Sequence, residues 1–225
     1  MMDLGRFRTI LFDLDGTLVD TAPDLAGAMN AVLERNGRPH LPVAAVRAMV
    51  GRGARVLIEK GFAATGASAD PERLPGLVEN FLDYYRLNLT ANSVPFVGAR
   101  EVVADFAAQG ARLGVCTNKP FDLAEALLRE LDFRSPFHSV RGADSAPYKK
   151  PDPRHVYDTL TLAGGSHGEA VLIGDSETDV KAARAAGIPV VLVSFGYTET
   201  PVTELGGDAI IDHFRDLPDA LRALA

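Results

Sequence analysis

The sequence predicts an α/β protein in which a parallel β-sheet is covered by helices on both faces and interrupted by an all-helical insertion. From about residue 95 onward, short apolar runs alternate with amphipathic helical patterns, which is typical of a parallel sheet. Between residues 22 and 92, the apolar residues follow helical spacing and no convincing strand is visible. We therefore expect an α/β core formed by residues 1–20 and 95–225, and a separate helical cap formed by residues 21–94.

The first strand is predicted from the segment that runs from Thr9 to Thr17. Its apolar residues stop at Asp13 and Asp15, which are followed by a glycine and a hydroxyl. An apolar run of this kind is typical of a buried parallel strand, and ligands bind at the carboxyl edge of such sheets. Because two neighbouring carboxylates repel each other, we expect a divalent cation to neutralise them.

The insertion after this strand contains four stretches with helical periodicity. They cover residues 21–36, 43–50, 54–62 and 72–89. At the start of the first stretch, Thr21 and Asp24 have the spacing of a capping box. Hinges between the insertion and the core are expected near residues 19–22 and 93–98.

The remaining core elements alternate along the chain. Strands are expected at residues 112–116, 138–141, 170–173, 189–193 and 210–211. Helices are expected at residues 99–109, 123–131, from 153 onward, 177–186 and 217–224. Asp152 is placed to cap the helix that begins at Pro153, and Ser176 with Asp179 has the spacing of a capping box.

The composition predicts a soluble protein of the cytoplasm. The 225 residues are 47% hydrophobic and 24% charged, which is ordinary for a globular protein. The net charge of −7 argues against nucleic acid or an anionic membrane as a partner. The single cysteine, Cys116, excludes an intrachain disulfide and fits a reducing compartment. No apolar stretch approaches the ~18 residues that a membrane span needs.

Four clusters of polar residues follow the predicted strands. They are Asp13 with Asp15, Thr117 with Asn118, the segment 149–153 and the segment 174–179. Because the strands of a parallel sheet end at one edge, we expect these clusters to converge there. Carboxylates suit Mg²⁺, while an amine, a hydroxyl and backbone N–H groups suit the oxygens of a phosphate.

These four clusters resemble the ordered motifs of the haloacid dehalogenase superfamily. The matching residues are Asp13-x-Asp15-Gly16-Thr17, Thr117, Lys150-Pro151 and Gly174-Asp175-x-x-x-Asp179. The helical insertion also resembles the cap of that superfamily, so the likeness extends over nearly the whole chain. The resemblance implies a doubly wound, Rossmann-like parallel sheet as the core.

Within the superfamily, four segments most resemble those of phosphoglycolate phosphatases. They are Gly51-Arg52-Gly53-Ala54, Thr117-Asn118-Lys119-Pro120, Lys150-Pro151-Asp152-Pro153 and Phe195-Gly196-Tyr197-Thr198. Arg52 departs from this pattern, because a smaller polar residue such as Asn is expected there.

The resemblance assigns the chemistry to three aspartates. Asp13 is the expected nucleophile, which forms an aspartyl-phosphate. Asp15 is the expected general acid and then general base, and it also lends its backbone carbonyl to the metal. Asp175 is the expected metal carboxylate opposite Asp13. Asp179 is either a further residue of the metal site or a helix cap, and the two roles are compatible.

Lys150, Thr117 and Asn118 are expected to bind the phosphate. Lys150 would stabilise charge near the nucleophile, and its place directly before proline distinguishes it from Lys149. Thr117 would donate a hydrogen bond to a phosphoryl oxygen, assisted by the N–H of Asn118, although a helix-capping role is the alternative. Arg52 is the candidate for reaching a substrate carboxylate from the cap, against the alternative of a solvated loop arginine.

The function that the resemblance implies is Mg²⁺-dependent hydrolysis of a small phosphate monoester, with 2-phosphoglycolate as the leading substrate. Phosphoryl transfer of the β-phosphoglucomutase kind, pyrophosphatase activity and nucleotidase activity are the alternatives among enzymes. A non-catalytic phosphate-binding module is the alternative from another class. The expected partner is the small phosphorylated substrate, and the chain would act as a monomer or a homodimer.

Overall fold

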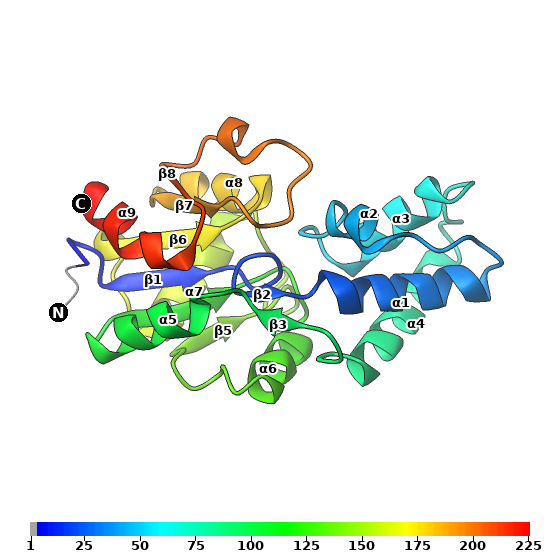
Figure 1. Cartoon of the computed structure of the whole chain (residues 1–225), viewed down its shortest axis with the longest axis horizontal. Helices are drawn as coiled ribbons and strands as arrows, with labels where there is room; N and C mark the ends of the chain where they lie inside the picture. Colours follow the sequence, from blue (N-terminus) through cyan, green and yellow to red (C-terminus); the bar gives the residue numbers. More distant parts are fainter. Residues whose placement is uncertain (1–3) are drawn as a thin grey trace.

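A computed structural model gives the structure of the protein and describes residues 4–225. Within this range, six strands form one parallel sheet (Figure 1). In spatial order they are β5 (Ser139–Arg141), β4 (Arg112–Cys116), β1 (Thr9–Phe12), β6 (Ala170–Gly174), β7 (Val190–Val193) and β8 (Ala209–Ile211). All five neighbouring pairs are parallel, and residues 1–3 of the predicted core lie outside the described range.

The order of the strands makes the sheet doubly wound. The chain moves from β1 to β4 and β5 on one side, and then returns to β6, β7 and β8 on the other. In such sheets, ligands bind where the direction of winding reverses, at the carboxyl ends of the central strands. Here that place is the edge where β1 and β6 end, and the predicted α/β fold class is confirmed.

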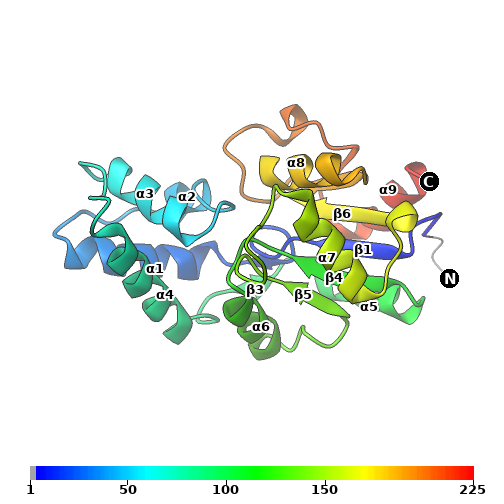
Figure 2. The ribbon, with the colours of Figure 1, turned by 180° about the vertical axis from the view of Figure 1, so that it is seen from behind.

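Helices cover both faces of the sheet (Figures 1 and 2). One face carries α7 (Pro153–Ala163) and α8 (Glu177–Ala186), and the other carries α5 (Ala99–Ala108), α6 (Phe121–Glu130) and α9 (Leu217–Ala223). Three short 3₁₀ helices are also present in the described chain, at His167–Glu169, Val202–Glu204 and Phe214–Asp216. Because both faces are covered, the central strands are apolar at nearly every position, as β1 and β6 illustrate.

The insertion forms a helical layer beyond the carboxyl edge of the sheet (Figure 1). It consists of α1 (Ala22–Arg35), α2 (Val43–Arg47), α3 (Ala54–Ala64) and α4 (Leu74–Leu87). The long α1 packs against the three other helices through one buried apolar face. A short antiparallel ribbon, β2 (Val19–Asp20) with β3 (Val94–Pro95), joins this helical cap to the core. The exact division of the chain at residues 20/21 and 94/95 stays a prediction.

One detail of the predicted insertion is wrong, because Thr21 and Asp24 do not form a capping box. The Asp24 carboxylate instead accepts hydrogen bonds from the backbone N–H and side-chain groups of Asn92 and Ser93, at 2.7–2.9 Å. The Thr21 hydroxyl donates to Asp15 and makes no cap hydrogen bond. Thr21 thus bonds to the loop that precedes it, and Asp24 bonds to residues 68 and 69 positions away, which the local spacing does not reveal.

Two other predicted helix starts are confirmed. The Asp152 carboxylate accepts a hydrogen bond from the N–H of Arg154 at the start of α7. Ser176 and Asp179 form the expected capping box at the start of α8.

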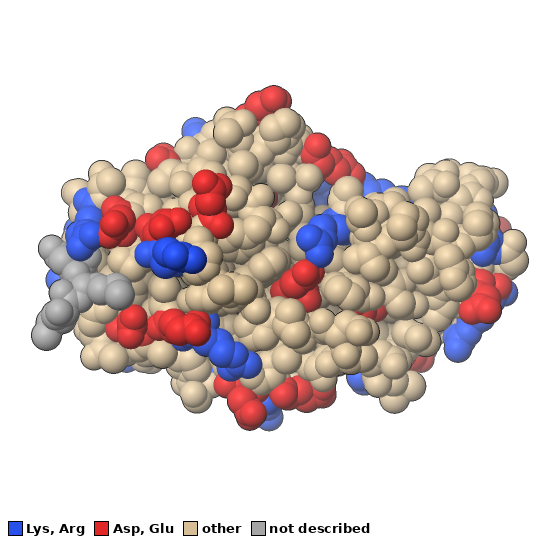
Figure 3. Space-filling model, in the orientation of Figure 1, with Lys and Arg blue, Asp and Glu red and all other residues tan. Residues whose placement is uncertain are grey.

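The surface carries charged side chains of both signs, scattered over the face that Figure 3 shows. Within residues 4–225, no helix combines the length and the apolar character that crossing a membrane requires.

Candidate active site

The central strands bring three of the predicted site residues to one edge of the sheet. Asp13 follows β1, Thr117 follows β4 and Asp175 follows β6, and these strands are direct neighbours in register. All three side chains are buried. The backbone N–H of Asp13 donates to the carbonyl of Ile173, and that of Thr117 to the carbonyl of Arg141, so the pairing of the sheet continues to this edge.

Lys150 contacts two aspartates, one from the segment after β1 and one from the segment after β6. Its Nζ atom lies 3.0 Å from Oδ2 of Asp13 and 2.6 Å from Oδ1 of Asp179. Burial alone would lower the pKa of Lys150, but the charges of Asp13 and Asp179 outweigh it and raise the pKa above its usual range. The second of the two adjacent lysines is therefore the buried one, while the Nζ of Lys149 donates to the carbonyl of Arg52.

The Asp175 carboxylate is held in a fixed orientation. Its Oδ1 accepts from the hydroxyl of Thr17 at 3.1 Å, and its Oδ2 accepts from the backbone N–H of Tyr197 at 2.6 Å. Gly16 allows this close approach, since a Cβ there would lie 2.5 Å from Oδ2 of Asp175 and its φ is +82°. The position of the Asp175 carboxylate therefore requires a glycine at position 16.

Asp13, Asp175 and Asp179 form a buried cluster of carboxylates. One oxygen from each lies within 4.8 Å of the other two. Burial raises the pKa of Asp13 to about 6, with a further contribution from the charge of Asp179 and against the opposing effect of Lys150. Burial, together with the charges of Asp179 and Asp13, also raises the pKa of Asp175 well above its usual range. A hard divalent cation would relieve this repulsion, and the oxygen donors fit one.

Both carboxylate oxygens of Asp179 accept hydrogen bonds from other groups of the protein. Its Oδ2 accepts from the N–H of Asp175 and from both the N–H and hydroxyl of Ser176, while Oδ1 accepts from Lys150. These bonds fix the loop that presents Asp175. Its role as a helix cap is therefore confirmed, and a role in binding metal stays a prediction.

Asp15 faces a different set of groups from the other aspartates. Its Oδ1 accepts from the hydroxyl of Thr21 at 2.7 Å and from Nζ of Lys119 at 3.0 Å. Among the described residues, no donor is directed at its Oδ2. One oxygen is thus fixed by the protein while the other is open to a substrate atom, which is the geometry that a general acid or base requires.

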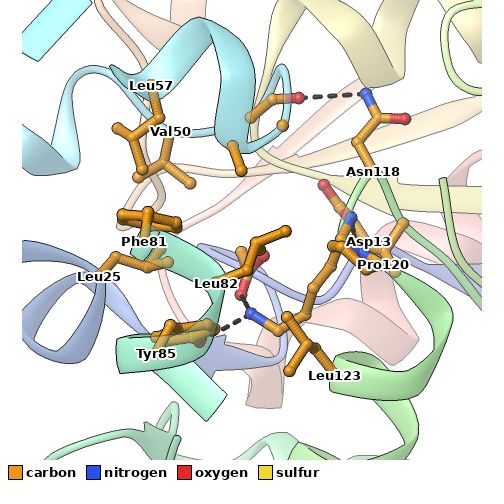
Figure 4. A pocket seen from close by; sticks show the side chains of 16 residues that line it. Asp13, Leu25, Val50, Leu57, Phe81, Leu82, Tyr85, Asn118, Pro120 and Leu123 are labelled. Carbon is orange, nitrogen blue, oxygen red and sulfur yellow. Dashed lines mark hydrogen bonds and ion pairs between the residues drawn. The ribbon is translucent and has the colours of Figure 1, made fainter. Parts of the chain in front are cut away.

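A pocket lies between the core and the cap, next to Asp13 and Asp15 (Figure 4). Its cavity volume of about 40 Å³ has room for only a few water molecules. The cap wall is mostly apolar and includes Leu25, Leu57, Phe81, Leu82 and Tyr85. The core side contributes Thr117, Asn118, Lys119, Pro120 and Leu123. The arrangement suits a small ligand with a polar end at the sheet edge.

Arg52 does not line this pocket. Its guanidinium lies 3.1 Å from Glu177 and is mostly exposed, beside a neighbouring hollow between the loop that follows α2 and the core segments 176–178 and 197–200. The side chain of Asn118 does line the pocket, and its amide donates to the carbonyls of Gly51 and Lys150. Asn118 therefore links the cap loop to the backbone of Lys150.

The sequence alone assigned no role to Lys119, Tyr85 or Tyr197, although Lys119 and Tyr197 stand in segments that resemble those of phosphoglycolate phosphatases. Lys119 follows Asn118 in the loop after β4, and its Nζ donates to the hydroxyl of Tyr85 at 2.7 Å. The Tyr197 hydroxyl donates to Asp20 and accepts from the N–H of Ala22, so it holds the ribbon at the base of the cap. A helical stripe that includes Tyr85 signals burial, but it does not indicate which polar group the hydroxyl meets.

Known proteins of similar sequence and structure share this organisation. A model of the haloacid dehalogenase-like hydrolase family matches residues 10–193. A phosphoglycolate phosphatase of Caulobacter vibrioides is 53% identical over 212 residues, which cover 94% of this chain and 90% of that protein. Another, from Mesorhizobium japonicum, is 43% identical over 205 residues, with coverages of 91% and 90%.

Solved structures agree with these relatives. The crystal structure of a predicted phosphoglycolate phosphatase from Haemophilus somnus superimposes with a TM-score of 0.90 at 30% identity. That match covers 96% of this chain and 99% of the other. The family model spans every site residue from Asp13 to Asp179, and the structure brings those of the four motifs together at one edge of the sheet. The chain therefore belongs to the haloacid dehalogenase-like hydrolase family.

Proposed function

We propose that this protein is a Mg²⁺-dependent phosphatase that hydrolyses a small phosphate monoester, with 2-phosphoglycolate as its substrate. One observation carries the proposal: residues from four distant segments meet where β4, β1 and β6 end. Asp13 lies 3.0 Å from Lys150 and in one carboxylate cluster with Asp175, and it lines the same pocket as Thr117. The names of the relatives supply the substrate, since several are phosphoglycolate phosphatases.

Asp13 and Asp175 would hold the magnesium ion, together with the backbone carbonyl of Asp15. When bound, the ion supplies positive charge that neutralises the two carboxylates and the phosphoryl oxygens. Lys150 adds a fixed positive charge 3.0 Å from the Asp13 carboxylate. The hydroxyl of Thr117 and the N–H of Asn118 would orient the phosphoryl group.

The reaction takes place in two displacements at phosphorus. A carboxylate oxygen of Asp13 bonds to phosphorus as the bond to the leaving oxygen breaks, and Asp15 gives its proton to that oxygen. Asp15 then takes a proton from water, whose oxygen bonds to phosphorus as the bond to Asp13 breaks. Phosphate leaves, and both aspartates return to their starting states. The free Oδ2 of Asp15 supports this assignment.

The size of the pocket favours a small substrate. Apolar side chains of the cap line the pocket next to Asp15, which limits the contact of the reacting groups with bulk water. We also place the protein in the cytoplasm, in keeping with the buried free thiol of Cys116. The choice between a monomer and a homodimer stays open.

Release of phosphate from a panel of monoesters tests the proposal. Wild-type protein should release phosphate from 2-phosphoglycolate faster than from nucleoside monophosphates or pyrophosphate, and EDTA should abolish the release. Conversion of β-glucose 1-phosphate to glucose 6-phosphate without free phosphate would instead indicate a mutase. Binding of phosphate esters with no turnover would indicate a non-catalytic module, and either result would overturn the proposal.

A further inference from the structure

Lys119 is a buried cation that lies on the wall of the pocket. It comes from the loop after β4, and only 3% of its side chain is exposed. Its Nζ atom donates to Oδ1 of Asp15 at 3.0 Å and to the hydroxyl of Tyr85 at 2.7 Å, the latter drawn in Figure 4. The same ammonium lies 4.3 Å from the centre of the Tyr85 ring. Lys119 thus contacts both the core and the cap.

The ammonium retains the capacity to bind a further acceptor. A lysine has three N–H donors, and among the described residues two acceptors lie within hydrogen-bonding distance of Nζ. Burying an ammonium is costly, and a single carboxylate with a neutral hydroxyl satisfies it only in part. The third donor is therefore available to a ligand in the pocket.

No other residue that lines the described pocket has a cationic side chain. Lys150 does not line the pocket, and its ammonium is paired with the carboxylates of Asp13 and Asp179. Arg52, the cap residue that the sequence offers for binding an anion, is paired with Glu177 outside the pocket. The surrounding cap side chains are apolar, so an anionic group on the substrate would find its counter-charge at Lys119.

The position of Lys119 relative to the bond that breaks suits a short substrate. Asp15 must lie within about 3 Å of the leaving oxygen to protonate it. Lys119 is hydrogen-bonded to the same carboxylate. A carboxylate that stands two bonds beyond the leaving oxygen would therefore come within reach of Nζ.

We propose that Lys119 binds the carboxylate of the substrate and thereby selects short, acidic phosphate monoesters. This inference rests on the proposed function, because it identifies how that site distinguishes 2-phosphoglycolate from a neutral ester. It assigns to the loop after β4 a recognition role that the cap arginine was expected to fill. A charge-assisted hydrogen bond in a site shielded from water provides this discrimination.

The test compares two substrates that differ in the carboxylate alone. Ethyl phosphate has the same number of carbons as 2-phosphoglycolate but ends in a methyl group. In Lys119→Met, the ratio of kcat/KM for 2-phosphoglycolate to kcat/KM for ethyl phosphate should fall by about 10- to 100-fold relative to wild type. Any displacement of Asp15 caused by the variant would slow both substrates and leave this ratio unchanged.

Two further variants keep the result interpretable. Lys119→Gln retains a donor for Asp15 and Tyr85 without the charge, so it serves if Lys119→Met does not fold, and the same fall in the ratio is expected. Lys181→Met removes a lysine that is exposed and paired with Glu177 on α8, and it should leave the ratio unchanged.

The outcomes separate the two proposals. A wild-type preference for 2-phosphoglycolate that survives in Lys119→Met and Lys119→Gln would overturn the role of Lys119 alone. A wild-type enzyme that does not prefer 2-phosphoglycolate over ethyl phosphate would overturn the proposed substrate, and this inference with it.

Discussion

The Nζ atom of Lys150 lies 3.0 Å from Oδ2 of Asp13, and both side chains are almost completely buried. Lys150 also lies 2.6 Å from Asp179, so one ammonium faces two carboxylates in a region from which water is excluded. An arrangement of this kind depends on every partner, because a buried charge without its counter-charge is strongly destabilising. The candidate active site and the stability of the core are therefore linked.

Replacing Lys150 by methionine should both inactivate and destabilise the protein. Asp13 and Asp179 would be left buried without their cation, at a cost of about 3–5 kcal/mol in the free energy of unfolding. Urea unfolding in the presence of EDTA would measure this loss, and phosphate release would measure the activity.

Lys149→Met is the matched control for that variant. Lys149 is adjacent in sequence but donates only to a backbone carbonyl, and it contacts neither carboxylate. The free energy of unfolding of the Lys149→Met variant should stay within about 0.5 kcal/mol of wild type. Equal destabilisation of the two variants would contradict the assignment of Lys150.

We expect the protein to lose stability in mild acid because of the buried side chain of His155. Burial, with added repulsion from Lys150 and Arg141, lowers the pKa of this side chain to about 4 in the folded state, from about 6.5 when unfolded. Between these two values the unfolded chain binds a proton that the folded protein does not. The contribution of His155 to the free energy of unfolding is therefore fully present above about pH 6.5. It falls as the pH decreases towards 4, by about 3 kcal/mol in total.

The contribution of His155 can be isolated by comparison with His155→Leu. The difference in unfolding free energy between pH 7 and pH 4 should be smaller in the variant by about 3 kcal/mol. Because other groups titrate in both proteins, only the change between them reports on this residue. Identical acid dependence in the two proteins would show that His155 is not the group responsible.

Asp24 should contribute to the junction between cap and core. Its carboxylate accepts four hydrogen bonds from Asn92 and Ser93, on the chain segment that returns from the cap to the core. Asp24→Ala would leave buried donors without an acceptor, and we expect a loss of at least ~2 kcal/mol in unfolding free energy. Thermal unfolding would detect it, whereas a loss below 0.5 kcal/mol (roughly the effect of a surface substitution) would contradict this role.

The core of the fold and the position of its site follow from local sequence features. The apolar run before Asp13 and the alternation of strands with helices after residue 95 both depend on residues close together in the chain. Since parallel strands end at one edge, polar residues that follow them must converge. The contact between Lys150 and Asp13 and the cluster with Asp175 bear this out.

The sequence does not predict contacts that arise only when cap and core come together. The ribbon of β2 and β3 has two residues in each strand, too few to produce a periodic pattern. Asp24 has the spacing of a cap residue, but distant donors compete for its carboxylate. Arg52 and Lys119 are similar cations in loops, and only the folded chain shows that Lys119 faces the pocket.

The proposed mechanism requires covalent phosphorylation of Asp13, and this species can be trapped with acid. Wild-type protein mixed with 2-phosphoglycolate and Mg²⁺ would be quenched in acid within a single turnover and digested for mass spectrometry. We expect one phosphoryl group on the peptide that contains Asp13, and none in Asp13→Asn. Turnover that proceeds with the phosphoryl group on another residue, or at an undiminished rate in Asp13→Asn, would contradict it.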